Sequence, residues 1–287
     1  MSKRLSLLAC KVVRMHTSCA GGAGGWGASM LTLVISLPTS TRRQEKISVR
    51  LQAAEIAFVM LMGVDGRELS ASEIRSFAPS PFMARFRRRI LAAEIGCTLS
   101  HKLALETFLA SEESTALILE DDAVVPANLR QAIASLLVHL PGDWGLLKVG
   151  GIGGVRGRLL LETAVGKIVR THATTVCAHA YVVSRQGASQ LLRNILPIRF
   201  PYDIYLRDTH VHGAKAFEVV PTLVAQEDLA GSRIDQGRIE NPSSSEMRSM
   251  LAYFAWKLGY EIRRRPHVLK IMGLSAAVAP SRITRHS

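Results

Sequence analysis

The sequence has few of the features that mark secreted, zinc-binding or membrane-spanning proteins. It contains four cysteines in 287 residues, none of them in a Cys-x-x-Cys pair. Scattered cysteines without zinc spacing favour reduced thiols in a cytosolic setting. No apolar run approaches the roughly 20 residues that a helix needs to cross a bilayer. Since 48% of the residues are hydrophobic, the chain can form a substantial core, and we expect a cytoplasmic protein.

Acidic residues are scarce relative to basic ones. The chain has 23 Asp and Glu against 36 Lys and Arg, a formal net charge of +13. This charge favours partners that carry phosphate, either nucleic acid or an anionic membrane or glycolipid surface. Residues 247–272 alternate apolar and basic side chains, which predicts one or two basic amphipathic helices. Such helices suit peripheral contact with the inner face of the cytoplasmic membrane, and packing against the domain explains the pattern equally well.

Three regions differ in composition. Residues 1–29 have no acidic side chain and include a glycine-rich run at 21–25 that cannot specify a fold. We therefore expect a disordered extension over 1–29. Residues 30–240 alternate strand-like and helix-like segments and form one predicted domain. Residues 241–287 form the basic amphipathic helical segment at the C-terminal end.

The alternation from Met30 onward predicts an α/β fold. A β-branched apolar segment, an amphipathic segment and a second apolar segment follow one another over 31–62, as in a βαβ unit. We expect strands at 31–37, 56–62, 116–119, 145–149, 165–170, 176–184, 216–220 and 223–225, and helices at 42–54, 92–110, 128–139 and 186–196. Residues 67–90 are expected to be irregular. The predicted architecture is a central mixed, mainly parallel sheet flanked by helices.

A buried strand that ends in three consecutive carboxylates is the strongest local signal. Four apolar residues at 116–119 run directly into Glu120, Asp121 and Asp122. Adjacent negative charges at the end of a buried strand are costly unless a cation or a donor-rich ligand compensates them. The carboxyl end of a strand is also where open α/β sheets bind ligands. We predict a divalent cation held by Asp122 with Glu120 or Asp121; a solvated acidic turn is the alternative.

Loop residues near other strand ends are candidates for binding a substrate. Arg42, Arg43 and Asp65 follow the first two predicted strands and would hold a nucleotide in the first βαβ crevice. The segment 150–154 has four glycines but lacks the G-x-G-x-x-G order, so a dinucleotide-binding loop is rejected.

One helix carries a second group of polar candidates. Glu94, Cys97 and His101 share one side of the helix at 92–110, with Ser100 beside them. A catalytic pair of Cys97 and His101 is conceivable, but a cysteine on a buried helix is more often a small hydrophobic residue. We expect Glu94, Ser100 and His101 to buttress or line the substrate site.

These motifs together resemble a known family. Their order along the chain is similar to that in glycosyltransferase family 25, the lipopolysaccharide galactosyltransferases related to collagen galactosyltransferases, over about residues 31–235. The matching segments are 33–37 with Arg42 and Arg43, 63–66, 94–101, 117–122, 180–184, 187–188 and 201–203. The resemblance implies a GT-A-like nucleotide-sugar-binding fold, a UDP-sugar donor (most often UDP-galactose), a divalent metal such as Mn²⁺, and anomeric inversion. It also implies a glycan or glycolipid acceptor such as lipopolysaccharide or lipooligosaccharide.

Inversion requires one base that takes a proton from the acceptor hydroxyl. Asp203 is the first candidate, because the family pattern also has an acid there, and Glu227 and Asp228 are the next. Two other functions stay open on the residues alone: a metal-dependent phosphoryl-transfer enzyme, and a non-catalytic binder of anionic surfaces. We expect no specific nucleic-acid partner, and the sequence makes no prediction of oligomeric state.

Overall fold

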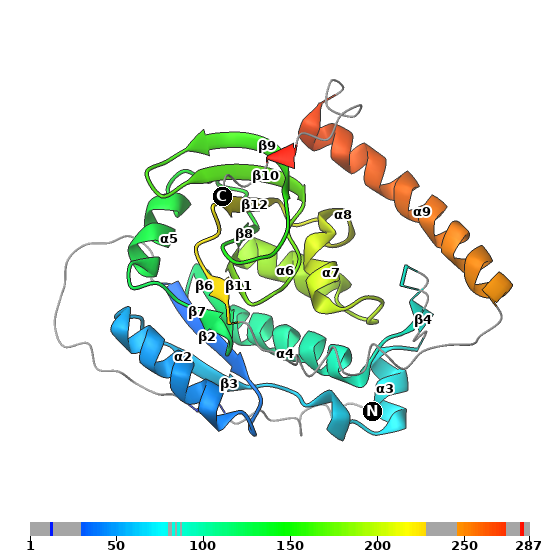
Figure 1. Ribbon diagram of the computed structural model, residues 1–287, viewed down its shortest axis with the longest axis horizontal. Coiled ribbons are helices and arrows are strands. Elements are labelled where there is room, and N and C mark those ends of the chain that lie inside the picture. Colours follow the sequence, from blue (N-terminus) through cyan, green and yellow to red (C-terminus); the bar gives the residue numbers. More distant parts are fainter. Residues whose placement is uncertain are drawn as a thin grey trace.

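The computed structural model describes residues 12–13, 30–79, 82–83, 85–86, 88–227, 246–273 and 282–283. A central sheet has helices on both of its faces (Figure 1). The helices are α2 (Thr41–Ala53), α3 (Ala71–Phe77), α4 (Ala92–Leu109), α5 (Leu129–Leu137), α6 (Arg185–Asn194), α7 (Tyr202–Arg207), α8 (Thr209–His212) and α9 (Glu246–Met272), with a 3₁₀ turn, η1, at Gly66–Glu68.

The main sheet contains ten strands in the order β1-β3-β2-β6-β11-β8-β12-β10-β9-β14. Their bounds are β1 (Val12–Val13), β2 (Met30–Ser36), β3 (Val59–Met62), β6 (Thr115–Glu120), β8 (Leu146–Lys148), β9 (Val155–Glu162), β10 (Lys167–Ala173), β11 (Ala180–Ser184), β12 (Ala216–Val220) and β14 (Arg282–Ile283). Two further pairs are β4 (Phe82–Met83) with β5 (Arg88–Arg89), and β7 (Ala123–Val124) with β13 (Ala225–Gln226).

The α/β class and the mixed sheet flanked by helices are confirmed, but the expectation of a mainly parallel sheet is wrong. Only the pairs β3–β2, β2–β6 and β8–β12 are parallel among the described strands. Strand β11 lies antiparallel between β6 and β8. Strands β6 and β8 run in the same direction and could have paired in parallel. Because β11 lies between them, the sheet has two antiparallel pairs at this point instead. A hairpin of β9 and β10 at the far side adds further antiparallel pairing.

The core has two halves, one on each face of the sheet. Along β6, Leu117 and Leu119 pack with α2 and α5, whereas Ile118 packs with α4, α6 and α7. This division follows from the alternation of side chains along a strand. Every residue of β6 before Glu120 is buried, so the strand is a rigid support for the carboxylates that follow it.

Residues 67–90 contain more regular structure than expected. They include η1, α3, β4 and β5. Helix α3 begins with a capping box, in which Ser70 and Glu73 bond each other's backbone N–H groups. The Ser-x-x-Glu pattern in the sequence is the signal that could have predicted this helix.

The two end regions differ in how they meet the sheet. Val12 and Val13 are the described residues of the 1–29 region, and they pair with β3; the expected disorder of that region otherwise falls outside the described residues. Helix α9 packs on α8 and β10, where Tyr260 Oη donates to Asp208 at 3.0 Å. Within the described chain, no helix has both the length and the apolar character that crossing a membrane requires.

Candidate functional site

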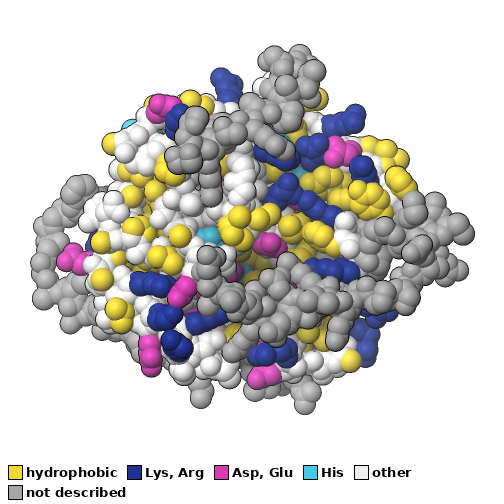
Figure 2. All heavy atoms as spheres, viewed as in Figure 1, with side chains coloured by type: hydrophobic (Ala, Val, Ile, Leu, Met, Phe, Trp, Pro, Cys, Tyr) yellow, Lys and Arg dark blue, Asp and Glu magenta, His cyan; other side chains and the backbone are white. Residues whose placement is uncertain are grey.

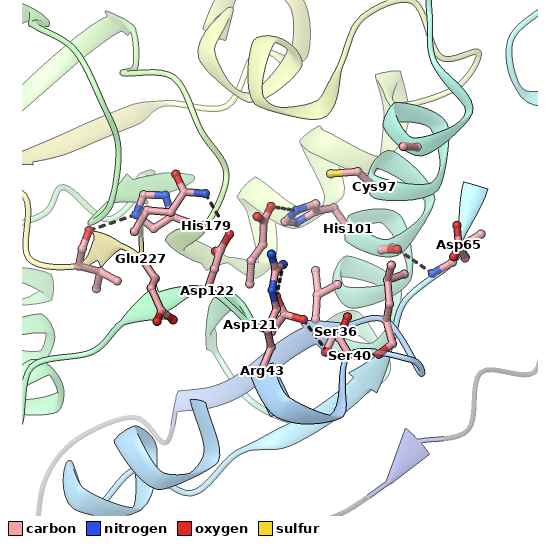
Figure 3. Close-up of a pocket in the computed structure, with 18 of the residues that line it drawn as sticks. Ser36, Ser40, Arg43, Asp65, Cys97, His101, Asp121, Asp122, His179 and Glu227 are labelled. Atoms are coloured by element: carbon pink, nitrogen blue, oxygen red, sulfur yellow. Dashed lines mark hydrogen bonds and ion pairs between the residues drawn. The ribbon is translucent and has the colours of Figure 1, made fainter. Parts of the chain in front are cut away.

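A cavity of about 490 Å³ opens at the carboxyl ends of β2, β3, β6, β8 and β12 (Figure 3). Of the predicted site residues, those that line it are Arg43, Asp65, Ser100, His101, Glu120, Asp121, Asp122 and Glu227. Arg42, Glu94 and Asp203 do not line it, and Asp228 lies outside the described residues. Strand direction explains the grouping, because these five strands run the same way and their following loops meet at one edge.

Asp121 is bonded to the scaffold. Ser36 Oγ donates to Oδ2 at 2.6 Å, and Arg43 Nη1 lies 3.3 Å from Oδ1. Burial raises the pKa of Asp121, and the bonds from Ser36 and Arg43 offset part of that rise. Asp121 therefore holds the Arg43 guanidinium at the cavity wall and has little capacity left for a cation.

Asp122 is bonded on one oxygen only. Gln226 Nε2 donates to Oδ2 at 3.1 Å. The other oxygen, Oδ1, is buried and has no hydrogen-bond partner in the described part of the chain. Burial and then the charge of Glu120 raise the pKa of Asp122 to about 7. A buried carboxylate oxygen without a donor, beside a second carboxylate, is the arrangement that a bound cation would stabilise.

Glu120 ends a buried hydrogen-bonded chain. His101 Nε2 lies 3.0 Å from Glu120 Oε1, His101 Nδ1 lies 3.1 Å from Tyr181 Oη, and Tyr181 Oη lies 3.0 Å from Tyr202 Oη. The His101 ring also stacks on Tyr202, with centroids 4.1 Å apart. Burial raises the pKa of Glu120, but the bond and charge of His101 outweigh it and the net shift is downward. This series of hydrogen bonds, with the charge of His101, thus keeps Glu120 ionised and fixes the direction of its carboxylate.

The donor atoms near Glu120 favour a hard cation. Cys97, His101 and Glu120 place one ligand atom each within 4.8 Å of one another. Burial raises the pKa of the Cys97 thiol well above its usual value, so the sulfur stays protonated and is a poor ligand. The oxygens of Glu120 and Asp122 are the ligands that Mg²⁺ or Mn²⁺ prefers. The residues present therefore fit a divalent cation of that kind.

Helix α4 supports the loop that carries Asp65. Ser100 Oγ accepts from the Val64 N–H at 2.8 Å and donates to the Gly96 carbonyl at 2.8 Å. A Cβ on Gly96 would lie 2.4 Å from the Gly66 nitrogen, and one on Gly66 would lie 1.7 Å from the Ala92 oxygen. Glycine at both positions is what lets the loop touch the helix backbone.

Glu94 supports the helix rather than the substrate. It is buried, and its carboxylate accepts from Arg88 Nη2 at 2.6 Å and from the Leu91 N–H at 2.9 Å. Of the two roles expected for Glu94, lining the site or buttressing it, the contacts agree with a buttress at the start of α4, because its oxygens are bonded to Arg88 and to the Leu91 N–H and Glu94 does not line the cavity. Arg42, for its part, is exposed on α2 outside the lining.

The predicted bases lie in different surroundings. Glu227 is held by Lys46 at 2.6 Å and Arg50 at 3.4 Å, and the Lys46 bond is the main cause of its lowered pKa. Asp203 lies in the first turn of α7, directly after Tyr202, and accepts from the Ile204 N–H at 2.8 Å. Its charge raises the pKa of Cys97, a lining residue, so its carboxylate lies within electrostatic reach of the cavity.

Sequence reasoning missed the partners that orient the carboxylates. Ser36 and Gln226 bond Asp121 and Asp122 across 85 and 104 residues of sequence, and no local pattern reports such a contact. Tyr181 and Tyr202 lie in segments that carry the family resemblance. Their place in those segments was the one feature of the sequence that could have pointed to the series of hydrogen bonds ending at Glu120.

Comparisons with known proteins agree with the motifs. Residues 30–150 match the family model for glycosyltransferase family 25 (LPS biosynthesis protein). Procollagen galactosyltransferase 1 of Danio rerio is 24% identical over 240 residues, which is 75% of this chain and 38% of that protein. An inactive glycosyltransferase 25 family member 3 of Homo sapiens is 27% identical over 224 residues, 69% of this chain and 37% of that protein. The chain therefore spans well under half the length of these curated relatives.

Two solved structures are also similar. A glycosyltransferase involved in glycosylation of the major capsid of PBCV-1 aligns with 72% of this chain and 96% of its own, at 12% identity and a TM-score of 0.37. A mannosyltransferase from Pyrobaculum calidifontis, solved with GDP-Man and Mn²⁺, aligns with 90% of this chain and 80% of its own, at 13% identity and a TM-score of 0.34. By the family model over residues 30–150 and by the curated relatives, this chain is similar to glycosyltransferase family 25.

Proposed function

We propose that this chain is a glycosyltransferase with a GT-A-like site that moves a hexose, galactose first, from a UDP-sugar to a glycan acceptor with inversion. The match of residues 30–150 to the family model supports the reaction class. One observation of the site supports the chemistry. Asp122, which lines a cavity large enough for a small ligand beside the ionised Glu120, has a buried oxygen without a donor among the described residues.

The chain's own residues have separate tasks in this proposal. Asp122 and Glu120 would hold the divalent cation, Mn²⁺ first, which supplies charge neutralisation to the departing diphosphate. Asp121 orients Arg43 so that its guanidinium can donate to a phosphate oxygen. The loop with Asp65 supports the nucleoside, since α4 fixes its backbone through Ser100.

The donor and the cation are tested together. The assay is hydrolysis and transfer of UDP-galactose with Mn²⁺ and with EDTA, using wild type, Asp122→Ala and the control Asp143→Ala. Asp143 is an exposed carboxylate paired with Lys215 away from the cavity lining, so its loss should leave turnover unchanged. We expect turnover that needs Mn²⁺ and is lost in Asp122→Ala alone. Equal turnover in EDTA, or release of inorganic phosphate in place of UDP, would count against the proposal.

Asp203 is the proposed base. It lies in the first turn of α7, and Tyr202 beside it stacks on His101, so α7 is fixed against the Glu120 side of the site. We expect Asp203→Asn to keep the affinity for UDP and to lose transfer, because a neutral amide cannot accept the proton of an acceptor hydroxyl. Equal loss of UDP binding and transfer would assign Asp203 to structure instead.

A glycan or glycolipid is the proposed acceptor, with lipopolysaccharide or lipooligosaccharide first. The family model's description names LPS biosynthesis, whereas the relative from Danio rerio is named for procollagen. Radiolabelled transfer to truncated lipooligosaccharides and to procollagen peptides distinguishes the two. Labelling of the peptides alone would reject the glycolipid acceptor.

A further inference from the structure

One side of α9 exposes large apolar side chains. Phe254, Leu258 and Ile262 are 56%, 66% and 62% exposed, and Leu269 further along the helix is 38% exposed. The first three are spaced four residues apart, so they form a continuous ridge on one side of the helix. We call this ridge, with Leu269, the outer face of α9.

The opposite side of α9 already has its partners within the domain. Tyr260 donates to Asp208, His267 Nε2 lies 2.8 Å from Thr209 Oγ1, and Ile271 is buried. The guanidinium of Arg85 lies 5.8 Å from the centre of the Trp256 ring. Packing against the domain therefore accounts for the inner side, while none of the residues that the structure describes covers the outer face.

The charges beside the outer face are almost all positive. Over 253–272 the sequence has five Lys and Arg and one acid. That acid, Glu261, is paired with Arg264 at 2.8 Å. Lys257, Arg263 and Lys270 are exposed, and the Arg265 side chain is 77% exposed. Figure 2 shows yellow apolar side chains and dark blue basic ones together over the part of the molecule where α9 lies.

We propose that the outer face of α9 docks on an anionic lipid surface. An apolar ridge bordered by cations is the pattern of a helix that lies in the plane of a membrane interface, with apolar side chains at the acyl boundary and basic groups at the phosphates. The long stems of Lys and Arg reach the headgroups while the ridge is inserted. A helix of 27 residues extends about 40 Å, so the contact can be long enough to fix the orientation of the domain.

Flotation with lipid vesicles tests the proposal on the full chain. The vesicles are pure phosphatidylcholine, or phosphatidylcholine with about 30% phosphatidylglycerol. We expect binding to the anionic vesicles that weakens with salt and is at least about tenfold weaker on neutral ones, since each basic group near an anionic surface adds to the affinity. Binding that is equal on both vesicles, or absent from the anionic ones, would overturn the proposal.

Variants locate the contact. Leu258→Glu/Ile262→Glu should reduce vesicle binding at least about tenfold. Val49→Glu/Val138→Glu is the matched control, because Val49 on α2 is 64% exposed and Val138, directly after α5, is 76% exposed, and it should bind within about twofold of wild type. Lys257→Gln/Arg265→Gln is a second variant that keeps the apolar ridge and should weaken binding and its salt dependence. Unchanged binding in both α9 variants would overturn the proposal.

Light scattering of the same proteins tests whether a second copy of the chain, in place of lipid, covers the outer face of α9. If wild type is a dimer that Leu258→Glu/Ile262→Glu dissociates, the outer face is an interface between two copies and the lipid proposal fails. Hydrolysis of UDP-galactose should be the same in wild type and both α9 variants, so this result is independent of the proposed catalytic site.

Discussion

Asp122 and Asp208 are both buried, yet they have opposite surroundings. Asp208 joins α7 and α8, and its carboxylate lies 2.6 Å from Arg85 Nη1, 3.0 Å from Tyr260 Oη and 3.6 Å from Arg207 Nη1. Among the described residues, Asp122 accepts a hydrogen bond from the neutral Gln226, lies beside the acidic Glu120 and feels the charge of Arg43 only at a distance. The Asp208 carboxylate thus has its cations in direct contact, and the Asp122 carboxylate does not.

The contrast distinguishes a buried carboxylate that holds the fold together from one that is placed to bind a ligand. A buried carboxylate with its cations in place joins elements, as Asp208 joins α9 and the Arg85 segment to α7. A buried carboxylate without one lowers stability, and such a cost is usual where a ligand is bound. The comparison therefore predicts opposite results from the same substitution at the two positions.

The largest expected effect is on turnover in Asp122→Asn. We expect UDP-galactose turnover to fall by on the order of a thousandfold, because the amide cannot hold a divalent cation against the diphosphate. The melting temperature should stay equal or rise, since a repulsive charge beside Glu120 is removed. Parallel kinetics and thermal unfolding check both results; a clear drop in melting temperature would make Asp122 a structural residue.

Asp208→Asn should have the reverse effect of Asp122→Asn: it should lower stability and change turnover little. Removal of its charge leaves Arg85 beside a neutral group, and we expect a loss of about 3 kcal/mol in the free energy of unfolding. Urea unfolding measures this loss, with the exposed Asp143→Asn as control. Turnover per folded molecule should change less than about threefold, because Asp208 lies outside the cavity lining. Loss of turnover without loss of stability would break the comparison.

The pH dependence of stability is the next test of the comparison between Asp122 and Asp208. Burial and the charge of Glu120 raise the pKa of Asp122 from 3.8 to about 7, so the folded state holds the proton more tightly than the unfolded chain. That contribution is fully present below about pH 4 and is lost as the pH rises through about 7. In EDTA we expect wild type to lose about 2 kcal/mol relative to Asp122→Asn between pH 5 and pH 8.

Urea unfolding of both proteins at several pH values measures this difference. Mn²⁺ should restore the stability of wild type at pH 8 and leave Asp122→Asn unaffected. Parallel stability curves for the two proteins in EDTA would show that Asp122 ionises as freely in the fold as in solution.

The smallest expected effect is at His101. His101→Ala removes the bond that orients Glu120, and we expect about a tenfold weaker Mn²⁺ affinity, as is typical for a partner of a metal ligand. His101→Gln retains an N–H donor and should recover part of the loss. Titration of turnover with Mn²⁺ measures both. An effect on kcat with no change in Mn²⁺ affinity would reassign His101 to the reaction itself.

The sequence predicted the supports of the site better than its contacts. β2, α2, α4 and β6 follow from apolar periodicity, and the carboxylates at the end of β6 follow from the abrupt change at Glu120. The place of β11 between β6 and β8 could not be predicted, because it depends on pairing between strands that are distant in sequence. The same holds for the bond of Ser36 to Asp121.

The β9 strand shows a second limit. Its first four residues alternate between buried and exposed, but Leu159, Leu160 and Leu161 are all substantially exposed, so no alternation or buried run continued along the strand to identify it. At the site, residue types indicated a cation, but which oxygen lacks a donor is known only once Gln226 is placed beside Asp122.

At the contact between Gly66 and Gly96, the addition of a single methyl group would displace the loop that carries Asp65. In Gly96→Ala the added carbon would meet the Gly66 nitrogen and, at 2.5 Å, the Val64 oxygen, so the Asp65 loop must retreat from α4. That contact does not involve the strands, helix α9 or the carboxylates at the end of β6. In the proposed site, this substitution would leave the cation ligands in place and weaken nucleoside binding, so one change would separate the two proposed parts of donor recognition.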